Sequence, residues 1–483
     1  MSAVAATLNP GPDAFDRLGE QVADRINPIV VKELRQGLRT RVFWIFFSVM
    51  LVANLLVSLV AFAAAKDGGT SVGQGAFIGY AVALACVQFF VIPYSAYRSM
   101  SREAEEETWV LLTLTGLGPR RILAGKVSSF VLQGSLYASA AAPFLLFSYY
   151  LNGIDLPTII VALLVSVAYQ VFLVAVSVSM ATLAETRIVR GLLHFVLLGL
   201  LLQGLGFGIA GTVGAAELSR KLIGDGLFWL VSSALLFGML TTGLMLFELA
   251  AARLSLPTEE YARGPRLWFL VQAGGLLGFF LWGWQVSGGN DVLVVGALCQ
   301  AAHALIVGGA VSADRDGMAR SHWLSGRRLS LLKPGAFRGF VLVTLVTLVT
   351  GALYGGLAVS HFSDVGDVAG VCAAPAFVIL YLSAPQLLAR WIPHPPSQTS
   401  LMVRVLAFGL FVLAVGLPPL LGELLSDADD LRFNLLNPTL GLANIFKENG
   451  EALPLVLVPW AVGVGLAAWA FGALRRRDVE PTT

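Results

Sequence analysis

Four glutamates stand within the short run 103–107 of this chain, directly before Thr108 and Trp109. Their chemistry is electrostatic, because negative charge is favourable at the N-terminal end of a helix. The stretch that follows is amphipathic and ends at the Gly-Leu-Gly-Pro sequence of residues 116–119. Anionic lipid head groups would repel the four carboxylates, which favours a protein as the partner of this surface. The sequence therefore predicts a short docking helix at about 103–117.

Groups suited to catalysis or metal binding are sparse. The carboxylates of the loop at 422–452 are typical of a solvated acidic turn rather than of a catalytic constellation. Cys86, Cys299 and Cys372 lie far apart inside apolar runs and lack C-x-x-C spacing, which indicates neither a disulfide nor a metal site. We expect no catalytic residue, no cofactor and no metal.

The stretch Gly118–Lys126 superficially resembles a phosphate-binding loop. A P-loop needs the pattern G-x-x-x-x-G-K-[ST] after a strand. Here six residues separate Gly118 from Gly125, and Val127 follows the lysine. The chain is not expected to be an enzyme, and any ATP hydrolysis must come from a separate chain.

These polar groups stand in a strongly apolar chain. Hydrophobic residues make up 57% and charged residues 13% of its 483 residues, against about 25% charged residues in a typical soluble domain, and the mean hydropathy is +0.78. Apolar runs of about 20 residues match the thickness of a bilayer core, in which each span must be a helix. The fold class is therefore all-α, a polytopic integral membrane protein with about 12 transmembrane helices. The net charge of +2 argues against nucleic acid as a partner and leaves the lipid bilayer as the main one.

The predicted spans form two sets of six. The first set is 42–64, 74–97, 124–150, 157–183, 191–212 and 226–251, and the second is 267–285, 291–311, 339–360, 368–389, 402–421 and 453–474.

Lys and Arg residues give the expected orientation. With a cytoplasmic N-terminus, only five of the 32 basic residues fall outside: Lys66, Arg220, Lys221, Arg432 and Lys447. Since basic residues are kept on the cytoplasmic side, both termini are predicted to be cytoplasmic, as tails at 1–26 and 475–483. The first 26 residues lack the apolar core of a cleavable signal, so we expect them to be retained.

Residues 27–41 are predicted to form an amphipathic elbow helix before the first span. An asparagine and a proline suit its N-cap and first helical position. Basic residues fall on one stripe and apolar residues on another, which suits a helix in the head-group layer. A simple basic anchor is the alternative. The residues of interest are Lys32, Glu33, Arg35 and Arg39.

Several motifs follow one another in a recognisable order. They are the elbow with Asn27-Pro28 and Lys32-Glu33-Leu34-Arg35, a two-span hairpin, the acidic run ending in Thr108-Trp109, then Leu111-Leu112, Thr115, Arg121-Ile122-Leu123 and Gly125-Lys126. In this order they resemble the permease subunit of ABC-2 type transporters over roughly residues 27–250. The tail from Asn437-Pro438 to Arg475-Arg476-Arg477 is also similar to the end of such permeases. Three positions depart from the pattern, since Glu107, Val110 and Gly116 stand where relatives usually carry Gly, Glu and Pro.

The resemblance implies that the helix at 103–117 is a coupling helix, which docks on a separate cytoplasmic ABC ATPase subunit and passes its ATP-driven closure to the spans. It also implies a multi-pass location in the cytoplasmic membrane of a bacterium, and export of a substrate that the sequence does not identify. Whether a second permease chain or a homodimer completes the pathway is left open. The docking residues implied are Glu103, Glu105, Glu106, Glu107, Thr108, Trp109, Leu112 and Thr115.

The second half, 252–474, repeats the loop rhythm of 42–251 and is predicted to be a diverged permease repeat. Its long inner loop at 312–338 would then hold the place of a second coupling element, although it is basic. The alternative is an ordinary positive-inside loop between accessory spans. His303, near the middle of its span, is the candidate for lining a path, because ionisable groups in lipid usually point inward.

Two other functions are open from sequence. An ion-coupled secondary transporter of twelve spans would place charges on broken helices near the midplane, where this chain has few. A membrane-embedded glycosyl or lipid transferase would need clustered carboxylates at a membrane face.

Overall fold

The computed structural model describes residues 28–66, 72–105, 118–151, 154–182, 187–222, 226–255, 259–314, 331–393, 398–424, 434–447 and 452–479. Within these ranges there is no strand, and twelve helical segments are long and apolar enough to cross a membrane. The predicted all-α polytopic fold is confirmed.

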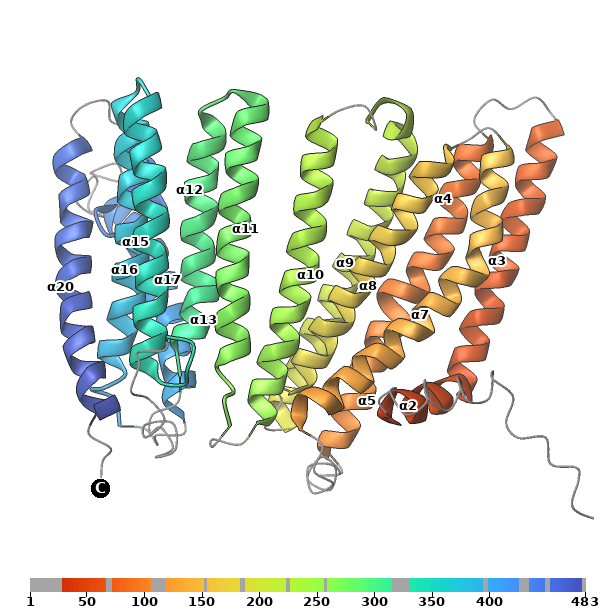
Figure 1. Ribbon diagram of the computed structural model, residues 1–483, viewed down its shortest axis with the longest axis horizontal. Coiled ribbons are helices and arrows are strands. Elements are labelled where there is room, and N and C mark those ends of the chain that lie inside the picture. The colour runs from red at the N-terminus through yellow and green to blue at the C-terminus, as the bar shows by residue number, and fades with distance from the viewer. Residues whose placement is uncertain are drawn as a thin grey trace, which may run out of the picture. The chain divides into compact units, whose positions relative to one another are not determined.

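Contacts divide the chain into two compact units, Met1–Ile223 and Gly224–Thr483. Unit 1 begins with the short helix α2 (Pro28–Leu38), which packs along α7 and lies across the ends of the longer helices (Figure 1). Its span helices are α3 (Arg41–Lys66), α4 (Val72–Ala85) continued by η1 (Cys86–Val91) and α5 (Ile92–Glu105), α7 (Pro119–Tyr150), α8 (Leu156–Thr182) and α9 (Arg187–Leu222).

Unit 2 is built around α16 (Val365–Leu388), which contacts the helices α12 (Asp291–His303), α15 (Ala336–His361), α17 (Thr399–Leu424), α19 (Leu440–Lys447) and α20 (Ala452–Val479). Small residues, together with Pro375 and Pro385, let the neighbours approach α16 closely, and most of its side chains are buried. The other helices are α10 (Gly226–Leu254) and α11 (Arg263–Ser287), and α12 is continued by η2 (Ala304–Gly308) and α13 (Gly309–Ser312).

Each predicted span coincides with one of the twelve long apolar helices, but several helices extend further. The second span was predicted to end at residue 97, whereas its helix runs to Glu105, and the third begins at Pro119 rather than at 124. Hydropathy marks only the part of a helix that faces lipid, so polar turns beyond it escape notice. Helix α10 packs against α11 and belongs to unit 2 by contacts, whereas the sequence division falls at 251. The division into two six-span halves stays a prediction.

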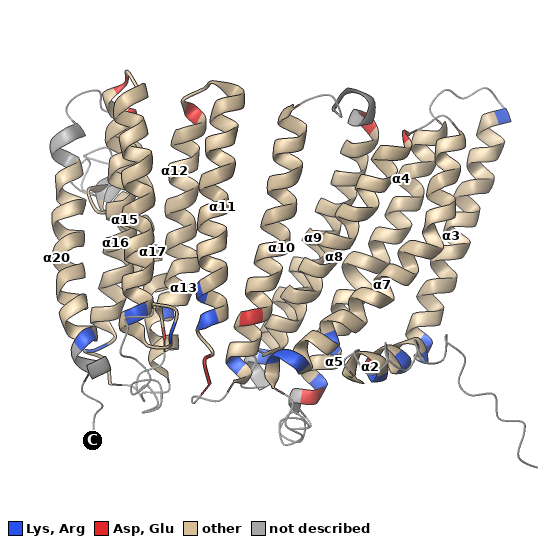
Figure 2. Ribbon diagram, viewed as in Figure 1, with Lys and Arg blue, Asp and Glu red and all other residues tan. Residues whose placement is uncertain are grey.

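In each unit, Lys and Arg residues gather at one end of the helices, here called the basic end (Figure 2). In unit 1 this end includes α2, the C-terminal turns of α5 and the first turns of α7, whereas Lys66 lies at the other end. The positive-inside rule predicts that the basic end is cytoplasmic.

Two spans contain a π-helical turn, η1 and η2, among the residues that the structure describes. A π turn accommodates an extra residue in an α-helix and is frequent at functional sites. The described part of each of these two spans ends at the basic end of its own unit, at residues 105 and 314, directly before residues 106–117 and 315–330.

Candidate functional site

Of the predicted docking residues, the structure describes the side chain of Glu103 alone. Glu106, Glu107, Thr108, Trp109, Leu112 and Thr115 lie outside the described residues, as does the side chain of Glu105. Glu103 is described, and it belongs to the last turn of α5. The structure thus differs from the expectation that residues 103–105 open a separate helix, and a coupling helix in the rest of the segment stays a prediction.

Glu103 binds a buried lysine from the next span. The ammonium of Lys126, in α7, lies 2.7 Å from Glu103 Oε1 and 3.3 Å from Glu33 Oε1. It also donates to Ser99 Oγ of α5 at 3.1 Å. Lys126 is only 1% exposed, and its three oxygen partners match the three N–H donors of an ammonium group. We call Lys126, Glu33, Glu103 and Ser99 the lysine joint.

The lysine joint connects three elements, because Glu33 comes from α2, Glu103 from α5 and Lys126 from α7. A carboxylate in the last turn of a helix is unfavourable beside the negative end of the helix dipole. A buried ammonium is equally unfavourable without a partner. Their pairing offsets both costs and ties the α5 end of segment 106–117 to the elbow helix and the third span.

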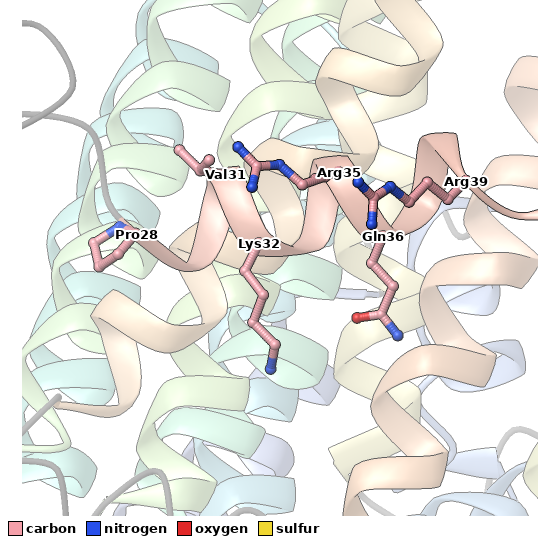
Figure 3. A pocket seen from close by; sticks show the side chains of 6 residues that line it. All are labelled: Pro28, Val31, Lys32, Arg35, Gln36 and Arg39. Atoms are coloured by element: carbon pink, nitrogen blue, oxygen red, sulfur yellow. The ribbon is translucent and has the colours of Figure 1, made fainter.

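The elbow helix has the two faces that its sequence predicts. Ile29 is buried, whereas Lys32, Arg35 and Arg39 are exposed. Figure 3 shows these three side chains beside a shallow hollow, which is lined by residues of α2 and by Arg39 just after it. Glu33 departs from this exposed group, since it turns toward α7 and Lys126.

Glu33 could have been recognised from its spacing. It follows Ile29 by four residues and therefore lies on the same side of the helix as that buried residue. A carboxylate on an apolar face needs a partner, but the sequence does not say that the partner is Lys126, which lies 93 residues away.

A glycine and two hydrogen bonds from aromatic side chains hold the elbow helix close to its neighbours. A Cβ at Gly37 would clash with the side-chain amide of Gln133 in α7. Trp44 Nε1 donates to the Leu38 carbonyl at 2.9 Å, and Tyr137 Oη donates to the Phe43 carbonyl at 2.8 Å. These bonds fix the corner at which α2 turns into α3.

Unit 2 holds a comparable group, at the base of the connection 315–330. Arg266 of α11 is 1% exposed, and its Nη2 lies 3.0 Å from Asp314 Oδ2, just after α13. Its guanidinium also donates to the carbonyls of Leu331 (3.0 Å), Lys333 and Gly335 (2.9 Å).

The carboxylate of Asp314 has further partners besides Arg266. It accepts hydrogen bonds from Tyr261 Oη at 2.9 Å and from Gly335 N at 2.8 Å. Gly335 has a φ of 128°, which favours glycine at this turn. Residues on both sides of 315–330 are thus held by one arginine. Among the described residues, Lys126 and Arg266 are the two buried cations. Lys126 lies in the span after the one that contains η1, and Arg266 lies in the span before the one that contains η2.

His303, the predicted path-lining residue, ends α12 directly before η2. Its ring stacks on Phe269 at 5.2 Å between centroids, and its Nε2 lies 3.1 Å from Gln272 Oε1 of α11. These contacts place His303 in the packing between α11 and α12. A role in a path stays a prediction.

Glutamines connect the spans of unit 1 around its π turn. Gln88 of η1 donates to the Gly134 carbonyl at 3.2 Å, and Gln170 of α8 donates to the Phe130 carbonyl at 3.1 Å. A Cβ at Gly134 would clash with the Gln170 amide. Three spans therefore share a polar contact inside the apolar part of the unit.

The fold and these contacts define the class as a polytopic α-helical membrane protein with a buried ion pair at the basic end of each of its two units. Within the described ranges, no group of three or more His, Cys, Asp or Glu residues could hold a metal ion. No protein-family model matches the chain, and comparison with curated proteins and with solved structures gives no match.

Proposed function

We propose that this chain is the permease subunit of an ATP-driven ABC-2 type transporter in the cytoplasmic membrane of a bacterium. A separate ATPase subunit hydrolyses ATP, docks on the segment that follows α5, and moves the spans so that a substrate is exported. The lysine joint is the observation that supports this proposal best.

A docking segment can drive spans only if its base is attached to them firmly. Glu103 lies three residues before segment 106–117, and its 2.7 Å contact with Lys126 attaches that base to α7. The second carboxylate, Glu33, extends the attachment to α2. A push on the segment would therefore reach α2, α5 and α7 together, as rigid-body coupling requires.

Photo-crosslinking in native membranes tests the proposal. A photoreactive amino acid at Trp109 should capture an ATPase, identified by mass spectrometry of the covalent product. The same amino acid at Gly75, an exposed position at the opposite end of unit 1, is the matched control and should capture none.

Two results would contradict the proposal. One is crosslinking at Trp109 only to lipid or to the chain itself when the membranes are intact. The other is substrate uptake by vesicles of the purified chain that follows an ion gradient without ATP, which would favour the secondary transporter.

A further inference from the structure

Unit 2 contains a small internal cavity between α12, α15 and α16, beside the π turn η2. The short side chains of four alanines leave room for it, Gly351 lets α15 lie close to Pro375 of α16, and Gln300 and Tyr354 bring polar groups to it. The cavity leaves a volume of about 10 Å³ for the centre of a water-sized sphere, which is the room that a single water molecule needs.

The polar groups of this cavity lack protein partners. Gln300 is 3% exposed and Tyr354 is 1% exposed. Neither Oε1 nor Nε2 of Gln300, nor Oη of Tyr354, has a hydrogen-bond partner among the described residues. Buried polar atoms are nearly always hydrogen-bonded to protein or to ordered water, so three such atoms at one cavity point to an occupant.

The two side chains belong to different helices but meet on one face of α12. A Cβ at Gly296 would lie 2.9 Å from Tyr354 Oη, so the hydroxyl of α15 reaches α12 at that glycine. Gln300 follows Gly296 by four residues and lies on the same face, one turn further along. A small molecule between them could bond to both.

Further acceptors surround the same space. Pro375 of α16 has no N–H, which leaves the carbonyl of Val371, another lining residue, without its usual helical donor. The hydroxyl of Thr350 donates to the Val346 carbonyl at 2.9 Å and keeps its lone pairs available. The cavity therefore offers one amide donor, one hydroxyl that can donate or accept, and several acceptor oxygens.

We propose that one ordered water molecule binds in this cavity and bridges the Gln300 amide to the Tyr354 hydroxyl. Water matches both the volume and the mixture of donors and acceptors. A cation would lie among neutral groups without a carboxylate among the lining residues, which is costly in an apolar interior. The water joins α12 to α15 at Gln300, one turn before η2 begins at Ala304, which also lines the cavity.

Hydroxyl-radical footprinting of the full chain in lipid nanodiscs tests this site. A pulsed X-ray beam makes radicals from water, and a buried side chain is oxidised only where a bound water lies beside it. Tyr354 should therefore be oxidised well above Tyr80 and Tyr137. Those two tyrosines are matched controls, because they are 0% and 2% exposed and each has a protein partner, Ser58 and the Phe43 carbonyl.

A Gln300→Met variant should lower the oxidation of Tyr354 to the level of the controls, since the water loses its second anchor. Gln386→Met, in α16 and outside the cavity, removes a buried amide of the same kind and should leave the oxidation of Tyr354 unchanged. Oxidation of Tyr354 at the control level in the unaltered chain, or unchanged in Gln300→Met, would overturn the proposal.

Two further measurements keep the proposal testable if Gln300→Met does not fold. A high-resolution density map of the unaltered chain should show a peak within hydrogen-bond distance of Tyr354 Oη and the Gln300 amide, and an empty cavity would refute the site. Thermal unfolding should not depend on whether Na⁺ or N-methylglucamine is the cation, since a sodium requirement would assign the site to an ion. None of these measurements depends on an ATPase partner.

Discussion

Among single residues, Lys126 makes ionic contacts with two carboxylates, those of Glu33 and Glu103. Removing one partner of a buried ion pair destabilises a protein more than replacing both partners by apolar residues, because the remaining charge stays buried without a counter-charge. In the lysine joint two carboxylates would be left behind, with Glu33 and Glu103 only 11% and 19% exposed. Lys126 should therefore matter for folding as well as for coupling.

We expect Lys126→Met to lower the free energy of unfolding by about 3 kcal/mol. Adding Glu103→Gln to this variant should restore part of the loss, because one uncompensated charge disappears. Unfolding of the purified chain in mixed micelles, followed by tryptophan fluorescence, measures both effects. Arg98→Met, at an exposed position of α5, is the control, and a loss equal to that of Lys126→Met would contradict the role of the joint.

Gly134 provides a second prediction at the same scale. Gly134→Ala should destabilise the chain by about 1–3 kcal/mol, because the new methyl group would displace the Gln170 amide from its place against α7. Gly206→Ala in α9 is the matched control, since its Cβ would meet no atom within 4 Å. The same unfolding measurement applies, and equal stability of the two variants would show that Gln170 can move away without loss.

The ion pairs at the basic end show which part of the site was accessible to sequence reasoning. The acidic run and the basic elbow were visible as local patterns, since each depends on neighbours within a few residues. The pairing of Glu33 with Lys126, or of Arg266 with Asp314, depends on how distant helices pack, and nothing in the local pattern selects these partners. In the sequence Lys126 stands out as the end of a false phosphate loop and as part of the Gly125-Lys126 motif, and neither pattern predicts an ion pair.

At the scale of elements, α2 has an exposed basic side and an inner side that packs against the helices of unit 1. Its exposed side carries Lys32 and Arg35, with exposed Arg39 just after its end, and its inner side places Ile29 and Glu33 toward the bundle. Hydrophobic periodicity predicted the helix and its exposed basic stripe. It assigned Glu33 to neither side, because periodicity alone does not reveal the partner of a charged residue.

Neighbouring substitutions on α2 should therefore differ in effect. Glu33→Gln removes a buried partner of Lys126 and should lower the unfolding free energy by about 1–3 kcal/mol. Lys32→Gln, one residue earlier on the exposed side, should change it by less than about 0.5 kcal/mol. Denaturant titration of the two variants measures the difference in unfolding free energy. A larger decrease for Lys32→Gln than for Glu33→Gln would contradict the assignment of Glu33 to the buried side of α2.

The span helices were predictable because each apolar run is long and bounded by polar or glycine-rich segments. Their polar extensions and π turns were not. The last turn of α5 is amphipathic and resembles a separate helix, whereas the backbone continues without a break from Ile92 to Glu105. A π turn changes the hydrogen-bond register by one residue and leaves no mark on hydropathy.

For the whole molecule, the distribution of Lys and Arg predicts which ends of the helices face the cytoplasm. Segments of unit 1 at the basic end are predicted to face the cytoplasm, and those at the Lys66 end to face outward. Gly75 and Gly118 report on the two ends, because both are exposed and a Cβ at either would meet no atom within 4 Å.

Cysteines at these positions, in a chain whose three native cysteines are replaced, should react differently with a membrane-impermeant maleimide. Gly75→Cys should be labelled on intact cells, and Gly118→Cys only after the membrane is permeabilised. Mass shifts of the purified protein measure the labelling. Labelling of Gly118→Cys on intact cells would reverse the orientation and leave no route for a cytoplasmic ATPase to the end of α5.

The π turn at Cys86–Val91 has a consequence for how this span tolerates deletions. Because a π turn holds one residue more than α geometry needs, removing one residue of that turn would let the helix relax to ordinary α geometry while both flanking parts keep their orientation. Glu103 would then still reach the ammonium that it contacts. Removing a residue from the regular helix α5 would instead rotate everything beyond it by about 100° about the axis. A deletion inside the bilayer should thus be tolerated at the π turn, whereas the same deletion a few residues further on would act like a mutation at the membrane surface.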